Sequence, residues 1–77
     1  MSYEIPLPKP ELLKEKPLEA PKVMEYLNSN GFNPIAVIVD NNLGKVFVYF
    51  EEPLSSSESK RLLEVVNEFY RKHVEGG

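Results

Sequence analysis

The only histidine of the chain, His73, is the first residue that could act as a catalytic base. Such a base needs a nucleophile or a carboxylate within hydrogen-bonding distance. The candidate nucleophiles are serines at the opposite end of the helix that we expect to carry His73: Ser55, Ser56, Ser57 and Ser59. A serine–histidine pair within one chain is therefore not expected. We interpret His73 as a residue near a helix C-terminus, favoured there by the helix macrodipole and packed at an interface.

Carboxylates are the next candidates for acid–base or metal chemistry. Glu51 and Glu52 stand at the end of an expected strand, where successive side chains point to opposite faces, so they do not converge on one site. The segment 40–44 (Asp-Asn-Asn-Leu-Gly) is similar to the start of a calcium loop, but glycine occupies the fifth position, which requires an oxygen ligand. Cysteine is absent, which excludes a thiolate zinc site. We expect no metal, no cofactor and no enzymatic activity.

The chain ends in Gly76-Gly77, a feature shared with ubiquitin-like modifiers and sulfur carriers, whose terminal glycine is activated by adenylation. Those proteins end in a strand before the glycine pair, whereas here a helix is expected to run almost directly into it. A simple helix stop explains the pair better. A Gly-Gly-terminated carrier is therefore the weakest of our functional hypotheses.

The charge distribution argues against nucleic acid as the principal partner. The formal net charge is -3, and lysines and arginines are interspersed with glutamates rather than gathered in a basic stripe. The aromatic residues Phe47, Tyr49 and Phe50 resemble a base-stacking platform, but acidic residues flank them where such platforms have Lys or Arg. As an alternative function we keep an accessory subunit of a nucleic-acid-processing complex. Its contacts would be four lysines of the N-terminal segment, Lys9, Lys14, Lys16 and Lys22.

Length and composition place the chain in a broad class. Seventy-seven residues make one small domain. The sequence shows no charged-then-apolar leader and no apolar run of about 18 residues, so we expect a cytoplasmic protein with no membrane association. Gln, Thr, Cys and Trp are absent while Lys and Glu are frequent, which is a thermophile tendency.

Local patterns predict an α+β domain with the element order α-β-β-α. Pro21 suits the first turn of a helix, and Asn30-Gly31 can form a left-handed cap, so a helix is expected over 21–29. The same cap would bring Phe32 against Leu27.

A central β-hairpin is expected next. β-branched and aromatic residues predict strands over 35–39 and 45–50. The turn residues 40–44 join them, with Gly44 in a left-handed or bulge conformation.

A long C-terminal amphipathic helix is the last expected element. Ser55 and Glu58 form the S-x-x-E capping box at its start, and Glu68 can pair with Lys72 one turn on. At 100° per residue, half of the helix circumference is apolar. This half contains Leu62, Leu63, Val65, Val66, Phe69, Tyr70 and Val74.

Residues 1–20 are expected to form an extended proline-rich arm beside a domain that spans 21–77. Tyr3, Ile5 and Leu7 alternate with Glu and Pro, which favours an arm that docks on a protein partner through these three side chains. Proline cannot donate a hydrogen bond to a ladder, so the segment would be an edge strand or a polyproline-like arm.

The predicted hairpin is apolar on both faces, although a sheet that is covered on one side alternates apolar with polar residues. Three arrangements could cover the second face. The N-terminal arm pairs at the sheet edge or folds beneath it, two copies join or stack their hairpins, or a different protein supplies the missing layer. We favour the second arrangement, in which another copy completes the sheet.

The sequence therefore predicts a non-enzymatic protein–protein interaction or assembly module that forms a homodimer. The residues expected at the interface are Phe47, Tyr49, Val46, Val48, Phe50, Leu62, Val66, Phe69 and Tyr70. Small viral and phage accessory proteins also often show this order of elements, and we keep them as a further alternative.

Overall fold

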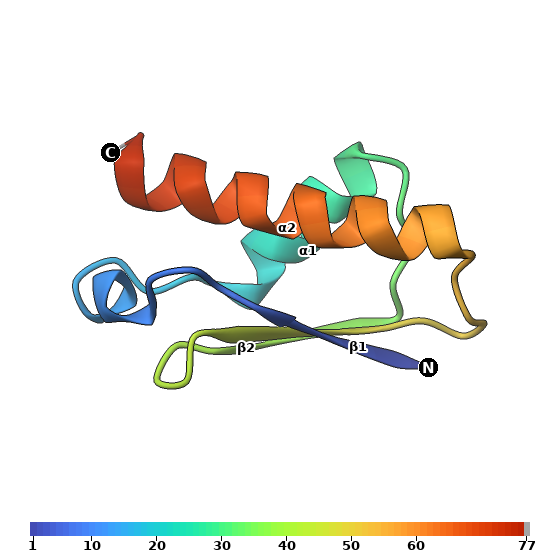
Figure 1. The fold of residues 1–77 in the computed structure, drawn as a ribbon, viewed down its shortest axis with the longest axis horizontal. Helices are drawn as coiled ribbons and strands as arrows, with labels where there is room; N and C mark the ends of the chain where they lie inside the picture. The colour runs from blue at the N-terminus through green and yellow to red at the C-terminus, as the bar shows by residue number, and fades with distance from the viewer. Residues whose placement is uncertain (77) are drawn as a thin grey trace.

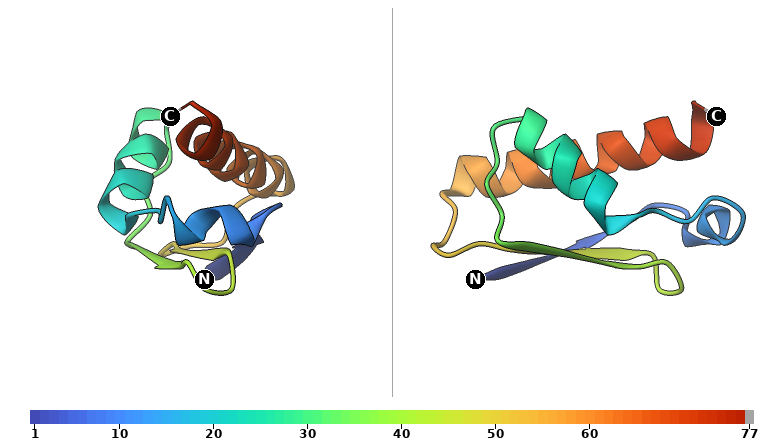
Figure 2. Two further views of the ribbon diagram at one scale, coloured as in Figure 1. Left: turned by 90° about the vertical axis from the view of Figure 1, so that its left-hand side faces the viewer. Right: turned by 180° about the vertical axis from the view of Figure 1, so that it is seen from behind.

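The computed structural model describes residues 1–76 and consists of two layers. A three-stranded antiparallel sheet with the strand order β1-β3-β2 forms one layer, and both α-helices lie on one of its faces (Figures 1 and 2). This confirms the small α+β class. The elements are β1 (Ser2–Pro6), a 3₁₀ helix η1 (Pro10–Lys14), α1 (Ala20–Ser29), β2 (Ala36–Asp40), β3 (Lys45–Tyr49) and α2 (Ser56–Glu75).

The predicted hairpin is formed by β2 and β3, with Ala36 paired to Tyr49 and Asp40 to Lys45. Its turn depends on Asp40, whose Oδ1 accepts hydrogen bonds from the backbone N–H groups of Asn42 and Leu43. Gly44 closes the turn with a φ of 69° and donates its N–H to the Asp40 carbonyl at 2.9 Å. The left-handed conformation predicted for Gly44 is therefore confirmed.

The N-terminal segment of the same chain supplies the third strand. β1 pairs antiparallel with β3, from Ser2 opposite Tyr49 to Pro6 opposite Lys45. Of the three arrangements considered for the apolar hairpin, the structure shows pairing of the N-terminal segment at the sheet edge. An arm that stands apart from the domain is not observed, because β1 is part of the sheet.

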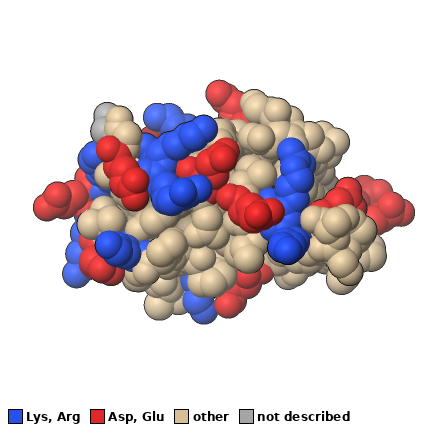
Figure 3. Space-filling view, turned by 45° about the horizontal axis from the view of Figure 1, so that its top comes forward, with Lys and Arg blue, Asp and Glu red and all other residues tan. Residues whose placement is uncertain are grey.

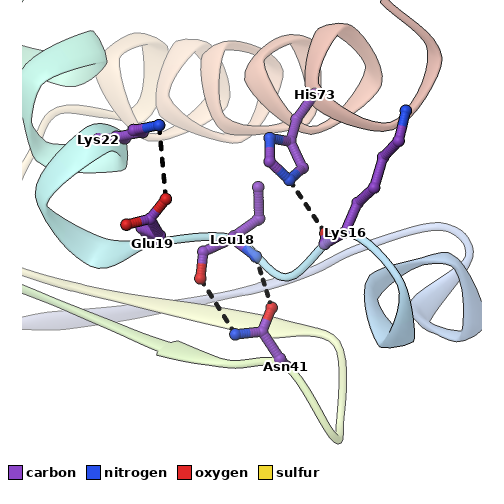
Figure 4. A network of polar contacts seen from close by, with 6 residues as sticks. All are labelled: Lys16, Leu18, Glu19, Lys22, Asn41 and His73. Carbon is purple, nitrogen blue, oxygen red and sulfur yellow. Dashed lines mark hydrogen bonds and ion pairs between the residues drawn. The ribbon is translucent and has the colours of Figure 1, made fainter. Parts of the chain in front are cut away.

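The segment between β1 and α1 is held by polar contacts from two sides (Figure 4). The side chain of Asn41, in the hairpin turn, accepts a hydrogen bond from the Leu18 N–H at 2.8 Å and donates one to the Leu18 carbonyl at 3.1 Å. His73 on α2 places Nε2 3.0 Å from the Lys16 carbonyl oxygen. The Tyr70 hydroxyl donates to the Lys9 carbonyl and accepts from the Lys9 N–H.

The helix ends follow the local signals in the sequence. At the end of α1 the Phe32 N–H donates to the Leu27 carbonyl and the Gly31 N–H to the Asn28 carbonyl, the pair of bonds that defines a Schellman motif. Gly31 has the expected positive φ, 87°. At the start of α2 the predicted capping box is present, with both of its reciprocal hydrogen bonds.

The core lies between the sheet and the two helices. β3 contributes Val46 and Val48, which are fully buried, and α2 contributes one face that runs from Leu62 to Tyr70. The N-terminal segment contributes four buried side chains, so it is integral to the core. The buried residues are Ile5, Leu7, Leu13, Leu18, Val23, Leu27, Phe32, Val46, Val48, Phe50, Leu62, Val65, Val66 and Tyr70.

Candidate interaction surface

The outer face of the sheet, which we define by Ala36, Ile38, Phe47 and Tyr49, is the apolar surface that the chain leaves uncovered. The helices lie on the opposite face, as Figure 1 shows. Side chains alternate between faces along a strand, so the residues paired with Phe47 and Tyr49 share their face. Ile38 lies opposite Phe47 and is 51% exposed, although it is the middle residue of its strand. Phe47 and Tyr49 are half-buried.

Polar residues border this outer face on two sides, with Lys45 and Asp40 at one end and Glu4 along β1, where it pairs with Phe47. Lys45 on β3 and Glu4 on β1 form a cross-strand ion pair with Nζ and Oε2 3.2 Å apart. Asp40 is the register partner of Lys45 on the other side. Five-residue strands of about 17 Å and three strands of about 14 Å together give the whole face an outline of roughly 240 Å². The outer face is therefore a small apolar patch with a charged border.

Most of the residues expected at an interface lie instead in the chain's own core. Val46, Val48, Phe50, Leu62, Val66 and Tyr70 are each no more than 5% exposed. They pack between the sheet and the helices and have no surface to offer to a partner. Phe69 is half-buried and lies against Tyr26, with ring centroids 5.1 Å apart. Of the nine expected residues, the structure brings only Phe47 and Tyr49 together on an open face.

The three side chains expected to dock the N-terminal segment on a partner dock on this chain instead. Ile5 and Leu7 are buried beneath α2, in the same apolar cluster as its core residues. Tyr3 packs edge-on against Phe50, with ring centroids 5.8 Å apart, and its hydroxyl accepts a hydrogen bond from the Leu54 N–H. The sequence pattern identified the correct inward-facing residues, but their binding surface belongs to the same chain.

A polar cluster joins the two helices at the surface. The predicted Glu68–Lys72 pair forms at 3.8 Å, and Tyr26 of α1 joins it by donating its hydroxyl to Glu68 and accepting from Lys72 Nζ at 3.1 Å. The hydrogen bond from Tyr26, followed by the charge of Lys72, lowers the pKa of Glu68. The hydrogen bond to Tyr26 also raises the pKa of Lys72. Both side chains are thus held in their charged forms, which does not suit a general acid or base near neutral pH.

Sequence reasoning missed the part that Tyr26 takes in this cluster. Its position on the first helix could be predicted from the sequence. The packing of α1 against α2, which brings Tyr26 to Glu68, is a long-range contact and could not. The i, i+4 spacing of Glu68 and Lys72 was the only local signal.

His73 contacts an aromatic ring and a backbone carbonyl group. The His73 ring stacks on Phe69, with centroids 6.2 Å apart, and its Nε2 contacts a backbone carbonyl. Within residues 1–76, no group of three or more His, Cys, Asp or Glu side chains is placed to hold a metal ion. Gly77, half of the terminal glycine pair, lies outside the described residues.

The lysines considered for nucleic-acid binding lie among carboxylates. Lys22 forms an ion pair with Glu19 at 3.4 Å, and Lys9, Lys14 and Lys16 are exposed. On the helical side of the molecule, Figure 3 shows basic and acidic side chains interspersed. That face therefore offers no continuous basic surface for a phosphate backbone.

The outer face of the sheet is thus the open apolar surface that carries Phe47 and Tyr49, two of the residues expected at an interface. No helix in residues 1–76 has the length and apolarity needed to cross a membrane. Comparisons with protein-family models, with curated proteins and with solved structures find no match to this chain.

Proposed function

We propose that this chain is a non-enzymatic protein-interaction module that binds partners through the outer face of its sheet. The observation that carries this proposal is the exposure of Ile38, midway along the edge strand β2 and beside two aromatic residues of the central strand, on a face that the helices do not cover. An antiparallel sheet with one solvated face normally presents polar side chains there. Apolar patches with a polar border are typical of protein–protein interaction sites.

A second copy of the chain is the simplest partner for this face. Two outer faces can stack with their apolar side chains interleaved, as in other packed sheets, at a separation of about 10 Å. The outline of the face, roughly 240 Å², is well below the ~800 Å² per partner that a standard stable interface buries. We therefore expect a homodimer that dissociates on dilution, with the charged border excluded from its centre.

Light scattering coupled to size exclusion, over a hundredfold range of protein concentration, tests self-association. The average mass of the wild-type chain should rise from one subunit towards two as its concentration increases. Ile38→Asp and Phe47→Asp should keep the mass at one subunit, because each would bury a charge in an apolar contact.

Leu63→Asp is the matched control. Leu63 is 44% exposed on α2, so the same charge is introduced at an apolar surface residue away from the outer face. Its mass profile should follow the wild type. Circular dichroism of each variant would verify that the fold is retained.

Photocrosslinking extends the test to a foreign partner. A benzophenone side chain at position 38 should form crosslinks to a second copy of this chain or to one other protein. The same group at position 63 should not form these crosslinks. A wild-type mass of one subunit throughout, together with no crosslink specific to position 38, would contradict the proposed function.

A further inference from the structure

β2 has a free edge with unpaired backbone groups. Hydrogen bonds from the Leu7 N–H to the Gly44 carbonyl and from the Phe50 N–H to the Met1 carbonyl show that even-numbered residues of β3 face β1. In an antiparallel ladder the odd-numbered residues of β3 then face β2. Their partners are the even-numbered residues of β2. The N–H and C=O groups of Val37 and Val39 therefore point away from the sheet.

The two free edges of the sheet differ in how well they are protected. On β1, Pro6 has no N–H, and Glu4 adds a charge, two common features of edges that avoid pairing. β2 contains no proline, and its only charged residue is Asp40 at its end. β2 is therefore the edge that remains competent to accept another strand.

Two packed helices are generally wider than three paired strands. Three strands span about 14 Å, whereas two packed helices about 10 Å apart and about 10 Å across span about 20 Å. The difference is close to the width of one further strand. In Figure 2 α1 lies over the β2 side of the sheet.

An apolar groove occupies the space where that strand would lie. Its volume is about 250 Å³, and its lining is Ala20, Pro21 and Met24 of α1 together with Val37 of β2. A strand paired with β2 would direct every second side chain into this groove, because side chains alternate between faces. The groove and the free edge are therefore two parts of one site.

We propose that the β2 edge binds an extended segment of a partner protein as a fourth strand. This inference rests on the proposed function only in taking the chain as a protein-binding module, and it adds a second binding surface, the β2 edge. The N–H and C=O groups of Val37 and Val39 would supply four backbone hydrogen bonds, the usual source of affinity in strand addition. The segment would carry apolar residues at alternate positions for the groove, and a basic residue near Asp40.

A second copy does not fit this edge. Pairing β2 with its counterpart would place the two strands about 4.8 Å apart and bring the α1 helices above them to less than the ~8–10 Å at which helices pack. A single extended segment brings no helix with it, so this clash does not arise.

Selection from a phage-displayed library of random dodecapeptides, with the full chain as bait, tests the proposal. The enriched peptides should have apolar residues at every second position. On binding of such a peptide, amide exchange at Val37 and Val39 should slow at least tenfold. N-methylation of the Val39 amide, introduced by chemical synthesis, should weaken binding at least tenfold.

Two further variants separate the edge from the groove. Met24→Lys places a charge in the groove and should also weaken binding at least tenfold. Ser29→Lys introduces the same charge on α1, where Ser29 lines a different groove, and should bind like the wild type. N-methylation of the Ser2 amide, on the β1 edge, should likewise leave the affinity unchanged.

Three outcomes would overturn the proposal. The library yields no peptide of alternating pattern, the peptides bind the N-methyl-Val39 chain as tightly as the wild type, or N-methylation of Val39 abolishes self-association in light scattering. The last result would assign the β2 edge to a second copy. None of these outcomes depends on Ile38→Asp, so the proposed role of the outer face stands or falls separately.

Discussion

At the residue scale, two features require glycine at position 44, its backbone conformation and the close approach of Pro10. Its φ of 69° is in the left-handed region that favours glycine, and its carbonyl accepts a hydrogen bond from the Leu7 N–H. A Cβ at this position would overlap the side chain of Pro10 in η1. Gly44 therefore fixes both the hairpin turn and the close packing of the N-terminal segment on that turn.

Substitution of Gly44 separates these two contributions. Gly44→Ala should lower the free energy of unfolding by about 3 kcal/mol, the sum of a left-handed backbone penalty and an overpacking penalty. Gly31→Ala is the matched control, because Gly31 also has a positive φ but open space where a Cβ would lie. It should cost about 1 kcal/mol. Urea denaturation measures both values, and equal losses would show that Pro10 does not constrain Gly44.

The left-handed turn at Gly44 could be predicted from the sequence, but its contact with Pro10 could not. Turn type depends on a few adjacent residues, and Asp40 to Gly44 carry that signal. The position of Pro10 depends on where the whole segment between β1 and α1 folds. That position is set by contacts such as those of Asn41 with Leu18 and of Tyr70 with Lys9, which join residues distant in sequence.

At the element scale, the start of α2 is stabilised by a pair of hydrogen bonds between Ser55 and Glu58. The Glu58 N–H donates to the Ser55 hydroxyl, and the Ser55 N–H donates to the Glu58 carboxylate at 3.0 Å. The bond from the Ser55 backbone, and then that from its side chain, lowers the pKa of Glu58 below its ordinary value. Ionised Glu58 is therefore part of the cap.

Ser55→Ala should destabilise the chain by about 1 kcal/mol at pH 7, the usual loss for an N-cap serine. Because the pKa of Glu58 is lower in the folded state, its contribution is present above the ordinary glutamate value and is lost as the pH falls through the lowered one. The difference in the free energy of unfolding between wild type and Ser55→Ala should therefore become smaller at pH values below the lowered pKa of Glu58. Urea denaturation at pH 7 and pH 3 measures it, with Ser56→Ala as the control. An equal loss at Ser56 would contradict the assigned cap.

Local signals predicted the elements well, with one instructive difference on α2. Leu63 belongs to the apolar half of the helix but is 44% exposed, whereas Leu62 and Val66 are buried. An apolar arc of half the circumference is wider than the strip of a helix that a small sheet and one neighbouring helix can cover. Helical periodicity identifies the apolar side, but the width of the buried strip depends on the packed neighbours.

At the scale of the whole molecule, the core depends on the N-terminal twenty residues. Ile5, Leu7, Leu13 and Leu18 are each buried to at least 94%. At roughly 1.5–3 kcal/mol for each buried side chain, they contribute about 6–12 kcal/mol, comparable to the total stability of a small domain. The fragment 21–77 should therefore not fold alone.

Circular dichroism of the fragment 21–77 and of the full chain checks this expectation. The fragment should lack a cooperative thermal transition, and adding a peptide of residues 1–20 should restore one. A cooperative transition in the fragment alone would show that 21–77 is a domain without its N-terminal segment. Leu12→Ala in the full chain is a useful control, because Leu12 is in the same segment but 43% exposed, and should cost little.

The long-range part of the fold was the part that the sequence predicted least well. The alternation of Tyr3, Ile5 and Leu7 indicated a strand with one apolar face, but gave no register and no partner strand. Once β1 pairs with β3, Val46 and Val48 become core residues, so they leave the predicted interface. The expected excess of apolar surface on the strands is reduced on the side that faces the helices and remains on the outer face of the sheet.

The pairing of β1 with β3 also has a consequence for the order of folding. The hairpin of β2 and β3 closes over a short turn, whereas Ser2 reaches Tyr49 only by closing a loop of most of the chain. Hairpins form in about 1–10 μs, and distant pairings come later because loop-closure entropy opposes them. During synthesis β1 leaves the ribosome first, yet its partner strand does not exist until residue 49 has been added. In that interval Ile5 and Leu7 have no core to pack into and remain exposed to water.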